Sequence, residues 1–203
     1  MSEATRWVTD TATDHSQTYV AHFRELAAQG RDLGGEARLL DALVAPGSRL
    51  LDAGSGSGRT GAVLHARGHQ VVGVDADPVL VAAAAEDHPG PTWIVDDLAA
   101  MDLRPHGVEG PFDGAVLAGN VMVFLAPGTE EAVLRRLAAH LRPDAPAVLG
   151  FATDRHYALA GFDAHADAAG FVVEHRFSTW DLRPWTEDAD FAVTILRRRE
   201  PHA

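Results

Sequence analysis

The sequence predicts an α/β protein with three layers, built on a doubly wound, mostly parallel sheet of seven strands with an antiparallel hairpin strand at the C-terminal end. Three observations predict this class. Short apolar runs alternate with helical patterns along most of the 203 residues, and Gly or Pro marks most junctions. The last two apolar runs, in contrast, are separated by a loop too short for a useful helix. The alternation indicates parallel strands joined by helices, and the end indicates an edge hairpin.

Two helices are expected before the first strand. Residues 1–14 are polar and rich in Thr and Asp, which favours a mobile start. Apolar residues then recur at helical spacing over His15–Gln29 and Glu36–Val44. Glycines separate the two segments, and Pro46-Gly47 follows the second, as expected where a helix ends.

Strands and helices alternate in the middle of the chain. The predicted strands are Arg49–Ala53, Gln70–Val74, Thr92–Val95, Phe112–Leu117 and Ala147–Ala152. The predicted helices are Gly58–Arg67, Pro78–Glu86, Thr129–Leu141 and Asp154–Ala169. Pro78 suits the first turn of its helix, and Thr129 is a plausible helix cap. The two strands of the final hairpin are Phe171–Thr179 and Phe191–Arg197.

The composition excludes several chemistries. All 17 basic residues are Arg, and the chain has neither Lys nor Cys. Without Lys there is no phosphate-binding loop of the Gly-Lys-Ser type and no Schiff base with a carbonyl substrate or pyridoxal phosphate. Without Cys there is no thiolate nucleophile, disulfide or zinc–thiolate centre. The remaining chemistry relies on positioning, carboxylates, imidazoles and backbone amides.

Charge and hydropathy narrow the class of partner. A net charge of −12 and a pI near 5.2 repel a phosphate backbone, so we expect no nucleic-acid partner. No apolar run approaches the roughly 18 residues of a membrane span, and the first residues are polar. We therefore expect a cytoplasmic protein, a monomer or homodimer, with no membrane partner. Most of the 11 His are scattered without metal-ligand spacing, and no metal is expected.

The most informative stretch joins the first predicted strand to the helix after it. Residues 50–61 read LLDAGSGSGRTG. Glycine tolerates positive φ and lets the backbone approach a ligand, while the N-terminus of the following helix offers unpaired N–H groups. Gly56, Gly58 and Gly61 also fit GxGxxG, the dinucleotide fingerprint, with Asp75 about 20 residues further on. The turn alone therefore leaves more than one ligand open.

Acids at the ends of three strands separate these alternatives. Asp52 lies in the first strand just before the glycine turn, where a pyrophosphate gains nothing from a carboxylate but a cationic ammonium does. Asp75 closes the second strand, and the pair Asp96-Asp97 closes the third. The carboxyl ends of neighbouring parallel strands meet at one crevice, so Asp52, Asp75 and Asp97 are predicted to surround one ligand.

From about Gly34 to Arg197 the sequence resembles the class I S-adenosylmethionine-dependent methyltransferases of the seven-stranded, Rossmann-like type. LLDAGSGSG is similar to the family's first motif, VVGVDAD to the acidic end of its second strand, and IVDDL to its third-strand motif. FDGAVLAGNVMVFL is similar to the fourth strand and its loop, and the closing hairpin matches the family's reversed last strand. The resemblance implies a single methyltransferase domain, residues 1–203, with residues 1–45 as a helical lid or cap segment.

The resemblance also implies S-adenosyl-L-methionine as the methyl donor. The cofactor-binding residues that it implies are Asp52, Ala53, Gly54, Ser55, Gly56, Asp75, Ala76, Asp97, Leu98, Asn120 and Tyr19. Asp52 would orient the methionyl ammonium, or else accept only from amides of the turn. Asp75 would accept from both ribose hydroxyls, a task that suits its two oxygens. Asp97 would accept from the adenine amino group, although Asp96 could take this place if the register shifts by one residue.

The remaining implied contacts concern the adenine ring and the transferred methyl group. The Leu98 N–H would face a ring nitrogen, and Ala76 would touch the ring. Asn120 would lie where methyl donor and acceptor meet, or else bridge a loop. Arg59, in the first turn of its helix, is expected at the surface. Methyl transfer from a sulfonium is an in-line displacement that depends mainly on alignment, which suits a chain without Lys and Cys.

A catalytic base is needed only if the acceptor loses a proton, and no residue is assigned to this role. Asn120, Tyr19, His15 and His156 are the candidates. Acceptor specificity is expected from Trp7 and from the loop 180–185, which could equally anchor the hairpin to the sheet. A small-molecule acceptor is favoured because of the acidic charge. Two alternatives stay open: an NAD(P)-dependent oxidoreductase, which the missing Tyr-x-x-x-Lys pair disfavours, and a non-catalytic S-adenosylmethionine-binding protein.

Overall fold

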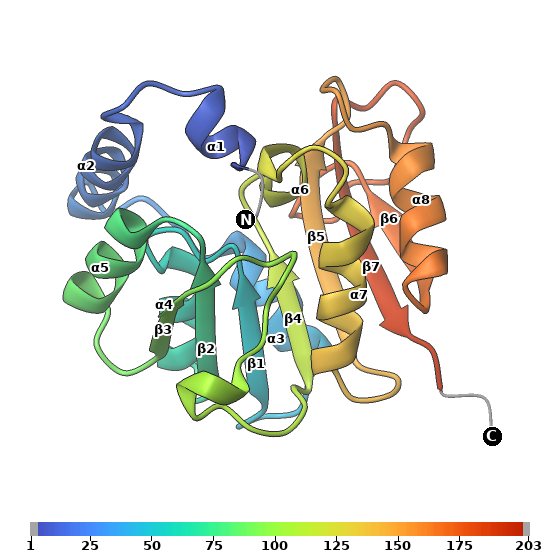
Figure 1. Ribbon diagram of the computed structural model, residues 1–203, viewed down its shortest axis with the longest axis horizontal. Coiled ribbons are helices and arrows are strands. Elements are labelled where there is room, and N and C mark those ends of the chain that lie inside the picture. Colours follow the sequence, from blue (N-terminus) through green and yellow to red (C-terminus); the bar gives the residue numbers. More distant parts are fainter. Residues whose placement is uncertain (1–3, 201–203) are drawn as a thin grey trace.

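The computed structural model describes residues 4–200 (Figure 1). Its strands are β1 (Arg49–Ala53), β2 (Gln70–Asp75), β3 (Thr92–Val95), β4 (Gly114–Leu117), β5 (Pro146–Ala152), β6 (Phe171–Phe177) and β7 (Phe191–Arg198). Its α-helices are α1 (Arg6–Thr9), α2 (His15–Ala28), α3 (Gly35–Leu43), α4 (Arg59–Ala66), α5 (Pro78–Asp87), α6 (Val121–Phe124), α7 (Glu130–His140) and α8 (Leu159–Ala168), with a short 3₁₀ helix, η1 (Arg104–His106).

The strands form a seven-stranded sheet in the order β3-β2-β1-β4-β5-β7-β6. β1 to β5 pair in parallel, and β7 runs antiparallel to both of its neighbours, β5 and β6. The chain order reverses between β1 and β4, so the crevice at their carboxyl ends is the expected ligand position of such a sheet. The predicted fold class is confirmed.

Alternating side chains of the strands supply two cores, one on each face of the sheet. Leu51 of β1, Leu117 of β4 and Phe151 of β5 pack with helices α7 and α8. Leu50 and Val116, their neighbours in sequence, face α3 and α4 on the other side. Burial on both faces explains why these strands read as continuous apolar runs rather than as alternating ones.

Several boundaries differ from the sequence prediction. Helices α1, η1 and α6 were not expected, because runs of three or four residues are too short to show helical periodicity. β4 begins at Gly114 rather than Phe112, and α8 begins at Leu159 rather than Asp154. Thr129 does precede α7, but its hydroxyl donates to the Ala126 carbonyl at 2.7 Å, so the expected side-chain cap is not formed.

The N-terminal segment crosses the carboxyl edge of the sheet (Figure 1). α2 packs against α5, and α1 lies beside α6 on the other side of the crevice. α3, which the lid prediction also included, instead packs on the sheet through the buried Leu39 and Leu40. The expected mobile start therefore contains an ordered helix from Arg6 onward, while residues 1–3 and 201–203 lie outside the described part. Within residues 4–200, no helix is long and apolar enough to span a membrane.

Candidate functional site

The glycine turn between β1 and α4 is a left-handed loop. Gly54, Gly56 and Gly58 have φ values of 79°, 53° and 83°, which other residues adopt only with strain. The N–H groups of Gly54 and Ser55 donate to the Val74 carbonyl at 2.7 and 3.0 Å, so the turn is fixed to the end of β2. The turn is thereby held open toward the crevice.

The glycines of this motif serve two different purposes. A Cβ at Gly58 or Gly61 would lie 2.9 or 2.8 Å from the ring of Trp93, so these two positions are glycine because of packing inside the protein. A Cβ at Gly56 would instead meet only Tyr19, at 3.7 Å. Gly54 and Gly56 both line the pocket described below. Gly54 serves both purposes, because a Cβ there would lie 2.3 Å from Val121, while the GxGxxG spacing through Gly61 reflects Trp93.

Asp75 is fixed at the end of β2 by two backbone amides. Its Oδ2 accepts from the Gly56 N–H at 2.8 Å, and its Oδ1 accepts from the Asp77 N–H at 2.9 Å. Each carboxylate oxygen has a second lone pair for a ligand hydroxyl. Burial raises the pKa of Asp75, while the amide hydrogen bonds act in the opposite direction. The carboxylate is held rigidly at the pocket wall.

The acids that follow β3 have separate functions. Asp97 lines the pocket, and its Oδ1 accepts from the Ala99 N–H at 2.9 Å. Asp96 instead accepts from the Asp97 N–H at 2.8 Å through Oδ1, and its Oδ2 accepts from the Asp102 N–H at 3.3 Å. Asp97 therefore lies at the pocket and Asp96 does not, which is the alignment of this acid pair that the sequence favoured.

These elements enclose a pocket of about 440 Å³ beneath the N-terminal segment, within the usual size range of small-molecule sites. The lining residues of the sheet edge are Gly54, Gly56, Asp75, Ala76, Asp77, Pro78, Val79, Leu80, Asp97, Leu98, Ala118, Gly119, Val121, Phe124 and Leu125. The lining residues of the N-terminal segment are Thr5, Trp7, Val8, Thr11, Ala12, Thr13, Ser16, Gln17 and Tyr19. Two distant parts of the sequence therefore build one site.

Other predicted cofactor-binding residues lie just outside this lining. Ala53 is buried in the core of the sheet, and Ser55 is buried with its Cβ close to Gly73 of β2. Asp52 is only 1% exposed, and its Oδ2 accepts from the Gly61 N–H at 2.8 Å. This contact corresponds to the alternative in which Asp52 satisfies an amide of the turn.

The electrostatic state of Asp52 is unusual. Burial raises its pKa to about 7, and the Gly61 N–H and the nearby Arg59 guanidinium offset part of this rise. The neutral acid and the carboxylate are therefore both populated near neutral pH. A cation that bound close to Asp52 would favour the carboxylate.

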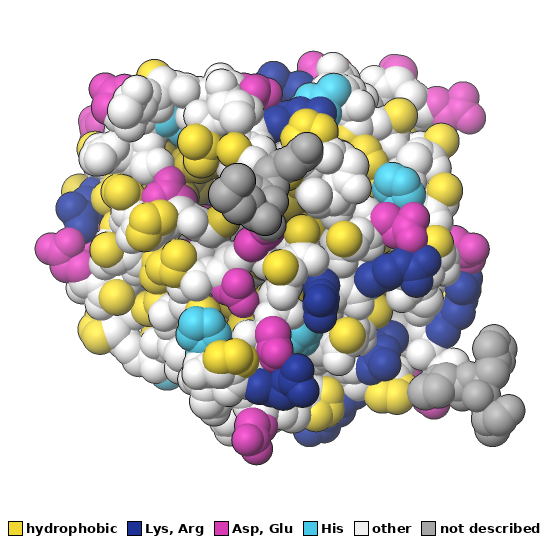
Figure 2. Space-filling view, in the orientation of Figure 1, with side chains coloured by type: hydrophobic (Ala, Val, Ile, Leu, Met, Phe, Trp, Pro, Cys, Tyr) yellow, Lys and Arg dark blue, Asp and Glu magenta, His cyan; other side chains and the backbone are white. Residues whose placement is uncertain are grey.

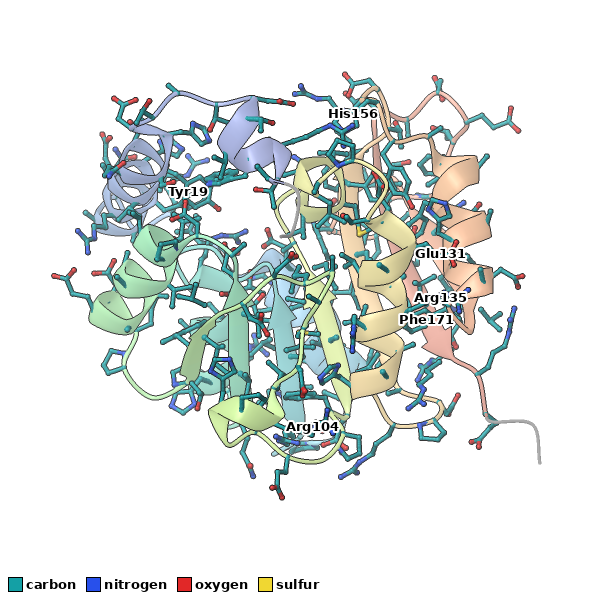
Figure 3. All side chains as sticks on the ribbon, viewed as in Figure 1. Tyr19, Arg104, Glu131, Arg135, His156 and Phe171 are labelled. Atoms are coloured by element: carbon teal, nitrogen blue, oxygen red, sulfur yellow. The ribbon has the colours of Figure 1, made fainter. Side chains whose placement is uncertain are left out.

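Tyr19 projects from α2 toward the glycine turn (Figure 3), and its ring lies 4.6 Å from that of Phe23. Burial raises the pKa of the phenol, and Arg59 only partly offsets this effect. The hydroxyl therefore keeps its proton near neutral pH. Tyr19 is suited to donating a hydrogen bond rather than to acting as a base.

Asn120 holds the loop after β4 in place. Its φ is 68°, and its side-chain Oδ1 accepts from the Ala152 N–H of β5 at 2.7 Å. Gly119, next to it, lines the pocket, whereas Asn120 does not. The geometry matches the loop-bridging alternative for the side chain.

The two histidine candidates lie apart from each other. His15 packs its ring 4.5 Å from that of Trp7. His156 is exposed in the segment between β5 and α8, away from Tyr19 in Figure 3. Neither of them lines the pocket. Within residues 4–200 no group of three or more acids and histidines could hold a metal ion, and the expectation of no metal stays a prediction.

The structure corrects the expectation that Arg59 lies at the surface, and it distinguishes the two alternatives for Trp180. Arg59 is not at the surface: its side chain is 15% exposed, and it pairs with Glu36 at 2.6 Å and lies over the Phe23 ring. Trp180 packs on Gly150 of β5 and joins the core beneath α3, so it is the anchoring alternative that holds for this residue.

Asp77 was not predicted, yet it organises the pocket. Its Oδ1 accepts from the Val79 N–H at 2.8 Å and so caps α5, and its Oδ2 accepts from Trp7 Nε1 at 2.9 Å and from the Ser16 hydroxyl. The order Asp-Pro at a helix start is a cap signal that could have identified the first function. The contacts with Trp7 and Ser16 join residues far apart in sequence, and no local pattern reports them.

The pocket separates two surfaces of different character. In Figure 2 hydrophobic side chains gather over α5, beside the crevice, while Arg side chains gather mainly over α7 and the strands to its right. Most of these Arg residues are paired with acids, as Arg135 is with Glu131 at 2.7 Å.

Comparisons with known proteins agree with this geometry. Residues 50–144 match the model of the family described as "Methyltransferase domain". A TehB-like SAM-dependent methyltransferase from Corynebacterium glutamicum is 39% identical, with a TM-score of 0.85, and the match covers 93% of this chain and 100% of that one.

Two further matches are more limited. The 1,6-didemethyltoxoflavin-N1-methyltransferase of Burkholderia thailandensis shares the fold, with a TM-score of 0.63 and 22% identity over 94% of this chain and 92% of that one. The ribosomal protein L11 methyltransferase of Symbiobacterium thermophilum is 49% identical over 93 residues, or 44% of this chain and 30% of that relative. The full-length match to the Corynebacterium protein decides the family: the chain belongs to the S-adenosylmethionine-dependent methyltransferases, enzymes whose methyl donor is S-adenosylmethionine.

Proposed function

We propose that this protein transfers the methyl group of S-adenosyl-L-methionine to a small-molecule acceptor by in-line displacement. The observation that carries the proposal is the pocket itself, in which Asp75, Asp97 and the turn at Gly54 and Gly56 meet at the carboxyl edge of the sheet. In this proposal residues 1–203 form one domain. The cap over the pocket is the part of residues 1–45 before α3.

The residues at the sheet edge fit the donor. Asp75 offers two fixed carboxylate oxygens to the ribose hydroxyls, and Asp97 offers an acceptor to the adenine amino group. Ala76 and Leu98 line the same wall, where they would border the adenine ring. Gly54 and Gly56 line the pocket without side chains, and the methionyl portion would lie along this stretch of backbone. Asp52 would act on the ammonium through the turn rather than by lining the pocket.

The protein's contribution to the reaction is positional. S-adenosylmethionine supplies a methyl group on a positively charged sulfur. The acceptor's lone pair must meet that carbon at about 3 Å, opposite the sulfur, and water must be kept out. The turn and Asp75 fix one side of this arrangement, while Trp7 and Phe124 close the other. No residue is required to form a covalent bond.

The N-terminal cap supports a small acceptor. Residues of α1, of the following loop and of α2 line the pocket together with the sheet edge, so an acceptor must fit beneath them. The relative named for ribosomal protein L11 matches this chain over only 93 residues. The match covers 44% of this chain and 30% of that relative, so that protein's substrate is an alternative to be tested.

Calorimetric titration of the purified protein with S-adenosylmethionine, S-adenosylhomocysteine and NAD(H) tests the donor. We expect the first two to bind and NAD(H) not to bind. Binding of NAD(H) alone would overturn the proposal in favour of an oxidoreductase. Binding of both sulfur ligands without turnover of any acceptor would favour the non-catalytic alternative.

Size fractionation tests the kind of acceptor. Cell extract, separated into small molecules and macromolecules, is incubated with the protein and S-adenosylmethionine labelled in its methyl group. We expect label in the small-molecule fraction, whereas label in protein, including purified L11, would contradict this expectation.

We also propose a cytoplasmic site of action, because the contents of charged and hydrophobic residues are those of an ordinary globular protein. Cell fractionation would test this proposal.

A further inference from the structure

The charges that line the pocket are all of one sign. Among the described lining residues, the ionisable side chains other than Tyr19 are the carboxylic acids Asp75, Asp77 and Asp97. None of the lining residues is Arg or His, and the chain has no Lys. An anionic acceptor would therefore lose its hydration beside carboxylates, with no cationic side chain of the lining to replace it.

Two Arg residues close to lining residues, Arg6 in α1 and Arg59 beside Tyr19, are already bound to other partners. Arg6 of α1 donates to the Leu125 carbonyl at 3.4 Å and lies 3.8 Å from Glu130. Arg59 pairs with Glu36 and donates to the Leu33 carbonyl at 2.7 Å. Neither guanidinium lines the pocket, so recruiting one for an acceptor anion would break an existing pair.

One wall of the pocket has no assigned contact with the methyl donor, and this wall is apolar. Trp7 and Val8 of α1 lie beside Phe124 and Leu125 on this wall, and the Trp7 and Phe124 rings pack edge to face with centroids 5.3 Å apart. The polar groups of this wall are hydroxyls and an amide, and the Thr11 hydroxyl is already bound to the Trp7 carbonyl. Such a wall favours an apolar or aromatic body.

The lining acids are also poorly placed to act as bases. Asp75 accepts from the Gly56 and Asp77 amides, and Asp77 accepts from Trp7, Ser16 and the start of α5. The Tyr19 phenol is protonated, as shown above. In the proposed function Asp75 and Asp97 bind the donor, and Asp77 holds Trp7 and Ser16 of the cap, so no lining acid is left to take a proton from the acceptor.

We propose that the methyl acceptor is an uncharged, largely apolar small molecule whose nucleophilic atom carries a lone pair at neutral pH, namely a heteroaromatic nitrogen or a thioether sulfur. The inference rests on the proposed function. It excludes acceptors that carry a carboxylate or phosphate, and it excludes protonated alkyl amines, which have no lone pair.

The reaction balances without a base. The acceptor's lone pair forms the new bond to the methyl carbon, and the bond between that carbon and the sulfonium sulfur breaks. Its electron pair stays on sulfur, which becomes a neutral thioether, and no proton moves. The positive charge passes from sulfur to the acceptor, and the pocket lining holds no Arg or His that would repel it.

Matched probe pairs test the inference. Transfer of labelled methyl from S-adenosylmethionine is measured for 4-phenylpyridine against 4-(4-pyridyl)benzoate, and for thioanisole against 4-(methylthio)benzoate. We expect kcat/KM to be at least about tenfold higher for the uncharged member of a pair. Equal or faster methylation of the carboxylates would overturn the inference.

Binding of the same probes to the protein saturated with S-adenosylhomocysteine gives a readout that does not need turnover. We expect the uncharged probes to bind and the carboxylates not to bind. Tighter binding of the carboxylates, or no binding of any probe at millimolar concentration, would contradict the inference. If S-adenosylhomocysteine itself fails to bind, the proposed function fails; if it binds and only the charge preference is absent, the acceptor inference alone fails.

A variant provides a second test of the electrostatic argument. Leu125→Arg places a cation in the apolar wall, next to Phe124. We expect binding of 4-(4-pyridyl)benzoate to increase and binding of 4-phenylpyridine to fall, with S-adenosylhomocysteine affinity as the measure of a folded donor site. Unchanged preference in a variant that still binds S-adenosylhomocysteine would count against the inference.

Discussion

The indole Nε1 of Trp7 donates a hydrogen bond to Oδ2 of Asp77 at 2.9 Å, and this contact joins the N-terminal segment to the start of α5. The Ser16 hydroxyl donates to the same oxygen. Trp7 and Tyr19 also pack on a small hydrophobic cluster of Val20, Leu80 and Ala83, which is separate from the two main cores. The segment that covers the pocket can therefore be loosened without disturbing the sheet.

Trp7→Phe removes the hydrogen bond and keeps an aromatic ring. We expect the dissociation rate of S-adenosylhomocysteine to rise about fivefold, the effect of about 1 kcal/mol for one net hydrogen bond. Stopped-flow fluorescence during displacement by excess unlabelled ligand measures this rate. Trp185→Phe, in the hairpin loop outside the pocket, is the matched control. Identical rates in Trp7→Phe and the natural protein would show that the contact does not retain the ligand.

Asp75→Ala removes the fixed acceptor at the end of β2. We expect the affinity for S-adenosylhomocysteine to fall by about one to two orders of magnitude, or about 1.4–3 kcal/mol for the lost hydrogen bonds to a charged group. Calorimetric titration measures the affinity, and Glu131→Ala on the outer face of α7 is the control. An unchanged affinity would show that Asp75 does not bind the ribose.

The sequence was sufficient to predict which acids meet at the pocket, because this part of the site is built from the ends of strands. Asp75 ends β2 and Asp97 lies two residues after β3, so their convergence at one edge is a property of any parallel sheet with this order. The closing hairpin was predictable for a similar reason, since no helix fits between its two strands.

The rest of the site depends on contacts between distant residues, which no local pattern reports. Asp52 and Gly61 read as ligand-binding residues, but their hydrogen bond and the Trp93 ring beside Gly61 are internal contacts. Trp7 reaches Asp77 across about 70 residues, and α1 is too short to show a helical period. Arg59 appeared to be a surface residue because its partner Glu36 lies on a different helix.

The titration of Asp52 gives the protein a specific pH dependence. Its folded-state pKa is about 7, above the value of about 3.9 for an unfolded chain, so the folded protein binds a proton between these pH values that the unfolded chain does not. The contribution of Asp52 to the free energy of unfolding is therefore largest at low pH and decreases as pH rises through this window. The decrease is on the order of a few kcal/mol at most.

Asp52→Asn keeps an oxygen for the Gly61 N–H but cannot ionise. We expect the melting temperature of the variant, relative to the natural protein without ligand, to increase as pH rises from about 5 to 8. Thermal unfolding at a series of pH values measures the difference. Titrating groups far from Asp52 cancel between the two proteins, whereas Asp75, whose charge raises the pKa of Asp52, contributes to the difference. A difference that is constant across the series would show that Asp52 does not ionise in this range.

Gly73→Ala tests the inference that the glycines around Trp93 serve packing rather than ligand binding. A Cβ at Gly73 of β2 would overlap the Trp93 ring, so we expect the free energy of unfolding to fall by about 1–3 kcal/mol. Gly161→Ala in α8 is the matched control, because its Cβ would lie 3.8 Å from Tyr157, and we expect it to be neutral or stabilising by up to about 1 kcal/mol. Denaturant unfolding measures both. In the Gly73→Ala background, Trp93→Leu should restore part of the lost free energy of unfolding. If Gly73→Ala proves as stable as the natural protein, the packing explanation fails.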